Sequence, residues 1–162
     1  MSHLKRLKAP KSWPLSERKG VKFIARPSPG PHKLLESITI NSLLKEILGY
    51  ASTTKEVKLI LNQEIVLIDG KIRKDHKFPV GIMDVISIKQ TGQNFILLYG
   101  ENGKFKLHEI SKEETENKSY KITVKKMLRK KQTQLNLSNG NNLIVDKDSY
   151  KVGDTIIINQ NK

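Results

Sequence analysis

The sequence predicts an α+β fold in which a short unit of helices and strands is followed by a region made mostly of strands. Two amphipathic helical stripes fill residues 37–62, and two apolar runs flank an Asp-Gly turn within residues 65–88. Short strand-like segments separated by Gly turns occupy most of residues 92–162. Residues 1–36, which precede the helices, have no sustained hydrophobic period.

The first helical stripe runs from Ile40 to Leu48, where apolar residues recur at i, i+3, i+4, i+7 and i+8, and Gly49 suits its end. Thr53 and Glu56 have the spacing of a capping box, which predicts the start of the second helix. We therefore expect two short helices before the apolar runs.

The apolar run IVLI is followed by Asp69-Gly70, the strongest short-range signal for a two-residue hairpin. We expect residues 78–81 (FPVG) to interrupt strand pairing and the chain to return as a strand from Met83 to Ile88. Two helices and a small twisted antiparallel sheet would then form a unit of about fifty residues.

Further along, the turns ENG (101–103), NG (139–140) and GD (153–154) separate strand-like segments. The stretch SKEETENKSYK (111–121) is typical of a polar connection with one helical turn. Several short strands at this spacing predict a small barrel or rolled sheet.

The chain carries 30 Lys and Arg against 16 Asp and Glu, a formal net charge of +14. Such a surplus repels itself in a compact fold, and it is typical of proteins that bind a polyanion, with nucleic acid first and an anionic membrane surface second. No apolar run approaches the ~18 residues of a membrane-spanning helix, and the N-terminus lacks the apolar core of a signal peptide. The absence of cysteine excludes disulfides and thiolate ligands and fits a reducing intracellular compartment.

Residues 1–36 combine nine Lys or Arg with five of the six prolines. Because proline removes amide donors and fixes φ, we expect an extended basic arm without a core of its own. The arm would order on phosphates, while residues 37–162 would fold alone. A disordered solubilising tail is the alternative, but the large rings of Trp13 and Phe23 favour the ordered arm. Trp13 could stack on a base or fill a protein pocket.

The segment 53–88, TTKEVKLILNQEIVLIDGKIRKDHKFPVGIMDVISI, resembles the S4 RNA-binding domain that many RNA proteins share. A longer match is carried by the blocks HLKRLKAPKSWPL, RPSPGPHKLLESI, DGKIRKDHKFPVGIMDVISI and GKFKLHEISKEE. In this order they resemble the archaeal and eukaryotic small-subunit ribosomal protein S4e family. The family usually continues into a C-terminal KOW module, whereas this sequence stops at Lys162, either as a shortened member or as an incomplete chain, so functions of that module are not assigned here.

The resemblance implies three parts. They are a basic Pro-rich N-terminal arm over residues 1–36, an S4-like RNA-binding domain over 37–91 and a central β-rich domain over 92–162. It also implies a structural constituent of the small ribosomal subunit, in the cytoplasm, assembled in the nucleolus if the source is eukaryotic. Its partners would be small-subunit rRNA, bound through phosphate contacts, and neighbouring ribosomal proteins.

No enzymatic activity, cofactor, metal, membrane or small-molecule substrate is expected, because the four His are scattered and no catalytic arrangement stands out. Two alternatives stay open. One is a free RNA-binding factor built on an S4 domain, and the other is a fragment of an RNA-modifying or tRNA-charging enzyme. Residues 91–162 are short and poor in chemical groups for a catalytic domain, which counts against the second.

The candidate interface centres on four cations that follow the Asp-Gly turn, namely Lys71, Arg73, Lys74 and Lys77. On a structured edge they would contact phosphates and set register, although a solvated edge that blocks strand aggregation is the competing interpretation. Lysines of the two helices could line the same face, and the amides at the start of the second helix could bind a phosphate beside Lys55. The acid-free segment 118–131 is expected to be an RNA-facing loop. The candidate RNA-binding residues are Lys5, Arg6, Lys8, Lys11, Arg18, Lys19, Lys22, Arg26, His32, Lys33, Lys45, Lys55, Lys58, Lys71, Arg73, Lys74, Lys77, Lys125, Lys126, Arg129, Lys130 and Lys131.

Overall fold

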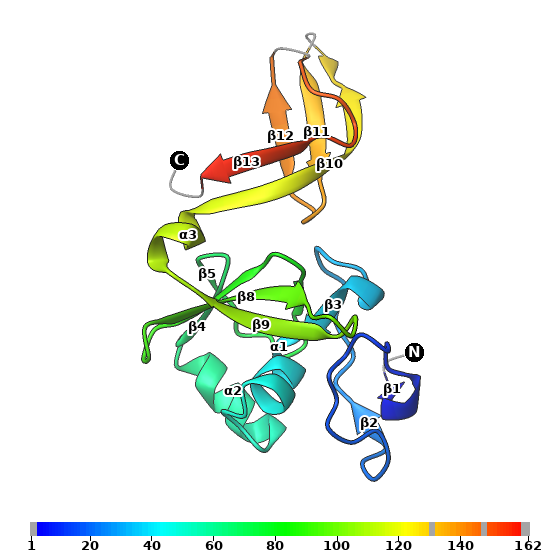
Figure 1. Cartoon of the computed structure of the whole chain (residues 1–162), viewed down its shortest axis with the longest axis vertical. Helices are drawn as coiled ribbons and strands as arrows, with labels where there is room; N and C mark the ends of the chain where they lie inside the picture. The colour runs from blue at the N-terminus through cyan, green and yellow to red at the C-terminus, as the bar shows by residue number, and fades with distance from the viewer. Residues whose placement is uncertain (1–2, 130–131, 147–148, 160–162) are drawn as a thin grey trace. The chain divides into compact units, whose positions relative to one another are not determined.

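The computed structural model describes residues 3–129, 132–146 and 149–159. It forms two compact units that divide between Ser111 and Lys112 (Figure 1). The N-terminal unit contains β1 (Leu4–Lys5), η1 (Arg6–Lys8), β2 (Phe23–Ile24), η2 (Leu34–Glu36), β3 (Ser37–Thr39), α1 (Ile40–Ser42), η3 (Leu43–Ile47), α2 (Thr54–Asn62), β4 (Val66–Ile68), β5 (Lys71–Ile72), β6 (Pro79–Gly81), β7 (Val85–Ile88), β8 (Gln93–Tyr99) and β9 (Phe105–Ile110). The C-terminal unit contains α3 (Lys112–Glu116), β10 (Asn117–Met127), β11 (Thr133–Leu137), β12 (Asn142–Val145) and β13 (Thr155–Asn159).

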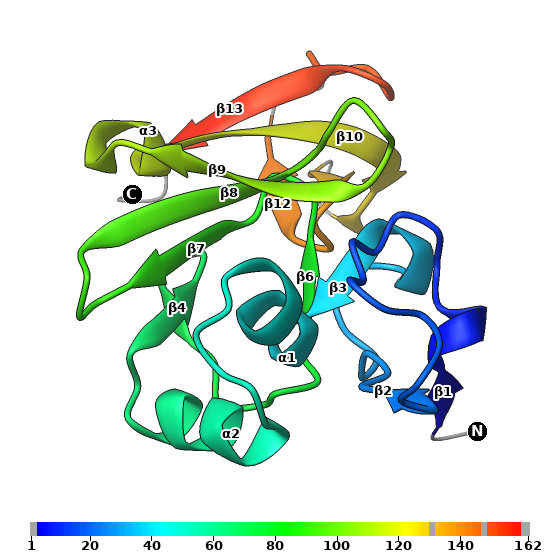
Figure 2. The same ribbon diagram turned by 60° about the horizontal axis from the view of Figure 1, so that its bottom comes forward.

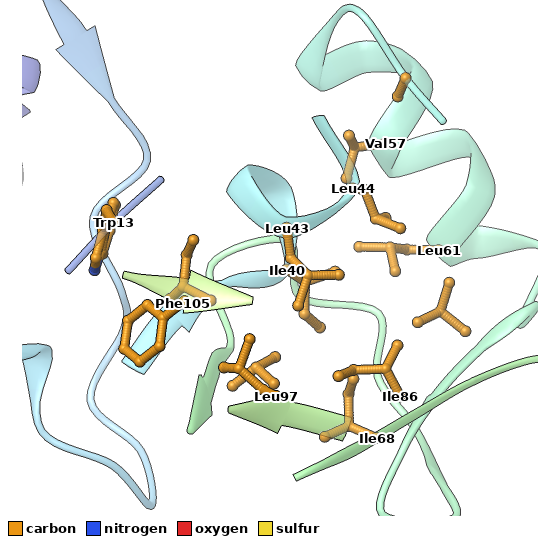
Figure 3. Close-up of a cluster of buried hydrophobic side chains, with 14 of the residues drawn as sticks. Trp13, Ile40, Leu43, Leu44, Val57, Leu61, Ile68, Ile86, Leu97 and Phe105 are labelled. Carbon is orange, nitrogen blue, oxygen red and sulfur yellow. The ribbon is translucent and has the colours of Figure 1, made fainter. Parts of the chain in front are cut away.

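The N-terminal unit is built on an antiparallel sheet with the strand order β5-β4-β7-β8-β9. α1 and α2 lie against one face of this sheet (Figure 2). Apolar side chains of the helices and the sheet meet in the core drawn in Figure 3, where Leu43, Leu61 and Ile86 are buried. Burying a side chain of this size contributes about 1.5–3 kcal/mol, so these contacts hold the helices on the sheet.

Both predicted helices are confirmed, as are their end signals. The first comprises α1 and a π-helical turn, η3, and ends at Gly49, whose φ of 69° is left-handed. The second, α2, begins with a complete capping box: the Thr53 side chain accepts a hydrogen bond from the Glu56 amide, and the Glu56 carboxylate accepts one from the Thr53 amide.

The predicted Asp-Gly hairpin is also confirmed, since Asp69 and Gly70 have φ values of 52° and 71°, as a type I′ turn requires. The expectation for residues 78–81 is wrong. Residues 79–81 are strand β6, which pairs with β3 instead of with the hairpin. Proline is tolerated there because it is the first residue of a short strand. The returning strand β7 begins at Val85 and pairs with β4 from Ile86, and not from Met83, which has a φ of 68°.

The expected arm is packed onto the N-terminal unit. β1 pairs with β2, and Leu4 and Ile24 pack against the main core. Trp13 is fully buried beside Phe105 (Figure 3), and its indole Nε1 donates a 2.9 Å hydrogen bond to the Ser37 carbonyl. The segment has no core of its own, as expected, and Trp13 takes the second of its two predicted roles by filling a protein pocket. Its packing could not be predicted because isolated apolar residues between prolines show no period, yet each can fill a core that other segments build.

The expected boundary between residues 91 and 92 also differs from the division seen in the structure. β8 and β9 pair along their whole length and join β7, which makes them part of the sheet of the N-terminal unit. The division into compact units falls after Ser111, where β9 has ended.

The C-terminal unit is a sheet with the strand order β12-β11-β10-β13. The long strand β10 pairs first with β13 and then with β11, and a register shift beside Thr123 turns it from one partner to the other. Buried Tyr120, Ile122, Leu135 and Leu137 form its core. The rolled sheet is therefore confirmed, as is the helical turn α3. Most of the segment expected to be a basic loop, residues 118–127, is instead strand β10.

Among the described residues, no helix has the length and apolar character that crossing a membrane requires.

Candidate nucleic-acid interface

The basic edge that follows the Asp-Gly turn is held by strands at both of its ends. The Asp69 carboxylate accepts a 2.9 Å hydrogen bond from the Val85 amide, which fixes the turn against β7. Lys71 follows on β5, the edge strand of the sheet, and its side chain is exposed. Residues 71–77, KIRKDHK, thus place four cations and one acid on one short, ordered segment.

Arg73 lies over the ring of Phe78, with its guanidinium carbon 4.4 Å from the ring centroid. Phe78 packs against the core, so the stacked guanidinium is held in place. The Arg73 Nε is buried and has no hydrogen-bond partner among the described residues. A guanidinium held in one orientation is suited to a phosphate.

Lys74 donates to the Glu64 carboxylate at 2.7 Å, and the two side chains are 61% and 45% exposed. The hydrogen bond and the charge of Lys74 lower the pKa of Glu64 below its usual value. Exposed pairs of this kind contribute little to stability, so Lys74 can exchange Glu64 for a phosphate at little cost.

His76 lies among cations and was not among the predicted site residues. Burial lowers the pKa of its imidazole, Lys58 and Lys77 lower it further, and Asp75 opposes them. The structure therefore brings Lys58 of α2 to the same place as the loop after β5. The available signal was the position of His76 between Lys74 and Lys77. A bound phosphate would favour the protonated ring.

A surface hollow beside this loop joins two segments that lie about fifty residues apart. It is lined by Arg26, Ser28, His32 and Lys77, together with two prolines and Leu34. The Ser28 amide donates to the Lys77 carbonyl at 2.9 Å, which seats the Pro-rich segment against the loop. Arg26 and Lys77, both predicted, thus face one opening.

Three predicted residues make contacts inside the fold. Arg6 is buried and bonds the Glu46 carboxylate at 2.9 Å. His32 Nε2 lies 2.9 Å from the Asp84 carboxylate, with side-chain exposures of 7% and 4%. Arg18 donates to the carbonyls of Ala9 and Pro10. These contacts make the three residues weaker candidates for RNA than the exposed cations.

The Arg6 ion pair lies at a second hollow, where Lys19 and Lys45 face Glu17 and Glu46. Two acids among three cations leave this hollow much less positive than the first. Burial alone would raise the pKa of Glu46, but hydrogen bonds from Arg6 and Ser16 outweigh it and hold that pKa below its usual value.

The expectation of a phosphate at the start of the second helix is opposed by the capping box. The carboxylate of Glu56 occupies that end and accepts hydrogen bonds from the Ser52 and Thr53 amides. These bonds lower the pKa of Glu56, so its negative charge persists where the phosphate would lie. Lys55 remains exposed on α2 as a single cation.

The remaining candidates are spread over both units. Among the described residues no group of His, Asp or Glu could hold a metal ion. The Lys125 ammonium donates to the Tyr150 carbonyl at 2.8 Å, and Lys126 and Arg129 are exposed. Lys130 and Lys131 lie outside the described residues. The exposed lysines of the N-terminal segment are Lys5, Lys8, Lys11, Lys19, Lys22 and Lys33.

Three family models match successive parts of the chain: the RS4NT domain over residues 2–35, the S4 domain over 42–86 and the ribosomal family S4e over 91–162. α1, α2, the Asp-Gly hairpin and the basic edge all lie within or beside the S4 match, so the chain is of the S4-domain class. The chain belongs to the ribosomal S4e family. The resemblance seen in the sequence blocks is thereby confirmed.

The chain is 45% identical to the small ribosomal subunit protein eS4 of Methanosphaera stadtmanae, over 97% of this chain and 64% of that protein. It is 41% identical to the protein of the same name from Caenorhabditis elegans, over 97% of this chain and 60% of the relative. The crystal structure of the 30S ribosomal protein S4e from Thermoplasma acidophilum superposes with a TM-score of 0.67 at 31% identity, covering 78% of this chain and 65% of that chain. The chain thus spans less than two thirds of the length of these relatives.

Proposed function

We propose that this chain is a structural constituent of the small ribosomal subunit, in the cytoplasm, and that it binds and stabilises folded rRNA without catalysis. The observation that carries the proposal is the ordered basic edge formed by Lys71, Arg73, Lys74 and Lys77, with Arg26 and Lys58 brought beside it. The names of the relatives, which are small-subunit ribosomal proteins, support it. Neighbouring ribosomal proteins are its further partners.

The mechanism is charge neutralisation by a preformed surface. Each Lys or Arg that meets a phosphate releases a condensed counterion, so affinity falls steeply as salt rises. Because the edge is held by the turn and by the Phe78 stack, little conformational freedom is lost on docking. Such contacts set the position of the protein on RNA and do not read bases.

A pair of double variants tests the edge. Lys71→Ala with Lys74→Ala removes two exposed cations without touching the Arg73–Phe78 stack. We expect weaker binding to small-subunit rRNA, measured by filter binding across a salt series, and a salt slope reduced by about 2, one for each lost phosphate contact. The circular dichroism spectrum should not change.

The matched control is Lys112→Ala with Lys151→Ala, which removes two exposed cations from the C-terminal unit and leaves the edge intact. Equal losses in both double variants would mean that only net charge matters, and the edge would lose its assigned role.

Sedimentation separates a ribosomal constituent from a free RNA-binding factor. We expect the chain to co-sediment with small subunits, whereas its absence from mature particles would favour the free factor.

A further inference from the structure

Tyr99, the last residue of β8, presents a half-exposed ring supported by the core. The ring is 47% exposed and stacks on Phe105, its cross-strand partner on β9, with centroids 5.1 Å apart and planes inclined by 11°. Phe105 is 2% exposed and lies beside Trp13 in the core (Figure 3). One face of the Tyr99 ring is therefore covered and fixed, and the ring remains accessible from outside.

Three lysines lie in segments next to this ring. Exposed Lys104 and Lys106 flank Phe105 in the chain, and strand alternation directs them to the face of β9 opposite Phe105. The Phe105 amide donates to the Ser12 carbonyl at 2.8 Å, which brings exposed Lys11, the preceding residue, to the same end of β9. The acid of the adjoining turn is Glu101. Three cations against one acid favour an anionic occupant.

Other half-exposed rings of the N-terminal unit are already engaged. The Tyr50 hydroxyl and the Gln93 amide oxygen form a 3.0 Å hydrogen bond. The Phe23 ring has the Lys22 ammonium 5.5 Å above it and the His3 ring 5.6 Å away. Tyr99 combines a rigid backing with a net positive neighbourhood along the chain, whereas a protein partner would be expected to require a larger apolar patch.

We propose that Tyr99 is a stacking platform for an unpaired nucleobase, at an end of β9 where Lys11, Lys104 and Lys106 make the local charge positive. The inference rests on the proposed rRNA-binding function and adds to it a contact made with a base. Unpaired RNA bases commonly stack on aromatic side chains, and the flat face of any base can be accepted. A ring fixed by Phe105 loses little freedom when the base arrives.

The test compares two ten-nucleotide RNAs that carry the same phosphates: oligoadenylate and an abasic oligomer. The full chain should bind oligoadenylate more tightly than the abasic oligomer. Tyr99→Leu keeps an apolar cover over Phe105 but removes the aromatic face. It should lose about 5- to 150-fold in affinity for oligoadenylate, which corresponds to ~1–3 kcal/mol for one stacked base. Tyr99→Phe should bind like the original chain.

Salt dependence supplies a second readout, because stacking releases no counterions. The salt slope should stay the same in Tyr99→Leu and fall in the Lys71/Lys74 double variant. Tyr50→Leu, which alters another half-exposed ring, should bind oligoadenylate normally. A Tyr99→Leu variant that binds oligoadenylate as before, or an equal loss in Tyr50→Leu, would overturn the platform. Failure of the chain to bind rRNA at all would instead refute the function on which the inference rests.

Discussion

The arginines and lysines of the N-terminal segment have two different roles. Arg6 and Arg18 direct their guanidinium groups at carbonyls and a carboxylate inside the fold, whereas the nearby lysines remain exposed. Physical chemistry favours this division, because a guanidinium offers five donors in a planar fork and is weakly hydrated, while an ammonium is strongly hydrated. A count of positive charges therefore overstates the cations that are free for RNA.

The Arg6–Glu46 pair gives a prediction about acid stability. The folded-state pKa of Glu46 lies below its ordinary value of 4.5. The unfolded chain therefore binds the proton first, so the pair stabilises the fold above that value and the contribution is lost as pH falls through the folded pKa. The free energy of unfolding of Glu46→Gln should be lower by about 1.5–3 kcal/mol at neutral pH, the value of a hydrogen bond to a charged group. It should also lose less stability than the original chain as pH falls below 4.5.

Urea unfolding at a series of pH values measures both effects. Glu36→Gln changes an exposed carboxylate on η2 and is the matched control. Its free energy of unfolding should fall with decreasing pH as it does in the original chain. If Glu46→Gln and Glu36→Gln gave the same pH profile, the Arg6 pair would not be a source of acid sensitivity.

At the scale of elements, the strand pair β3–β6 links parts that the sequence presents separately. β3 leads into α1, and β6 follows the basic loop after β5, so their pairing brings that loop back to the start of the helix. The Gly81 amide donates to Asp84, whose carboxylate also meets His32. A side chain on Gly81 would overlap the His32 ring, so glycine is required for space at this position.

Gly81→Ala tests this arrangement. The added methyl must displace the His32 ring from Asp84, and overpacking of this kind typically costs ~1–3 kcal/mol. We expect a lower melting temperature by calorimetry, together with loss of the His32 imidazole proton resonance characteristic of the Asp84 contact. A matched change is Gly70→Ala, since an added Cβ there meets nothing within 4 Å and acts only through the backbone at its φ of 71°. An undisturbed His32 signal in Gly81→Ala would contradict the proposed steric role.

At the scale of the whole molecule, residues 4–36 are part of the N-terminal unit and not an appendage. Trp13, Leu4 and Ile24 belong to or pack on the same core as the helices and the sheet. This packing argues against the expectation that residues 37–162 fold alone, which the deletion below tests. The exposed lysines of this segment remain candidates for RNA contact.

Deleting residues 1–36 should lower the melting temperature of the N-terminal unit by more than about 10 °C. The loss of Trp13 alone corresponds to ~3–5 kcal/mol, and each kcal/mol shifts melting by several degrees in a unit of this size. Trp13→Ala should reproduce most of the decrease. Phe23→Ala, which removes a ring that is 49% exposed, should produce little of it. A truncated chain that melts like the original would restore the picture of an independent arm.

The elements whose signals are local could be predicted from the sequence alone. The capping box at Thr53, the Asp-Gly turn before Lys71 and the alternating strands are encoded within a few residues, because caps, turns and pleats depend on near neighbours. The family and the basic edge after the turn could also be predicted from short stretches of the sequence. The three-dimensional fold was needed to show which cations form ion pairs, which apolar residues of the Pro-rich segment are buried, and where the first unit ends. These features depend on contacts between residues far apart in the chain, such as Trp13 with Ser37 and Ser28 with Lys77, which leave no periodic pattern in the sequence.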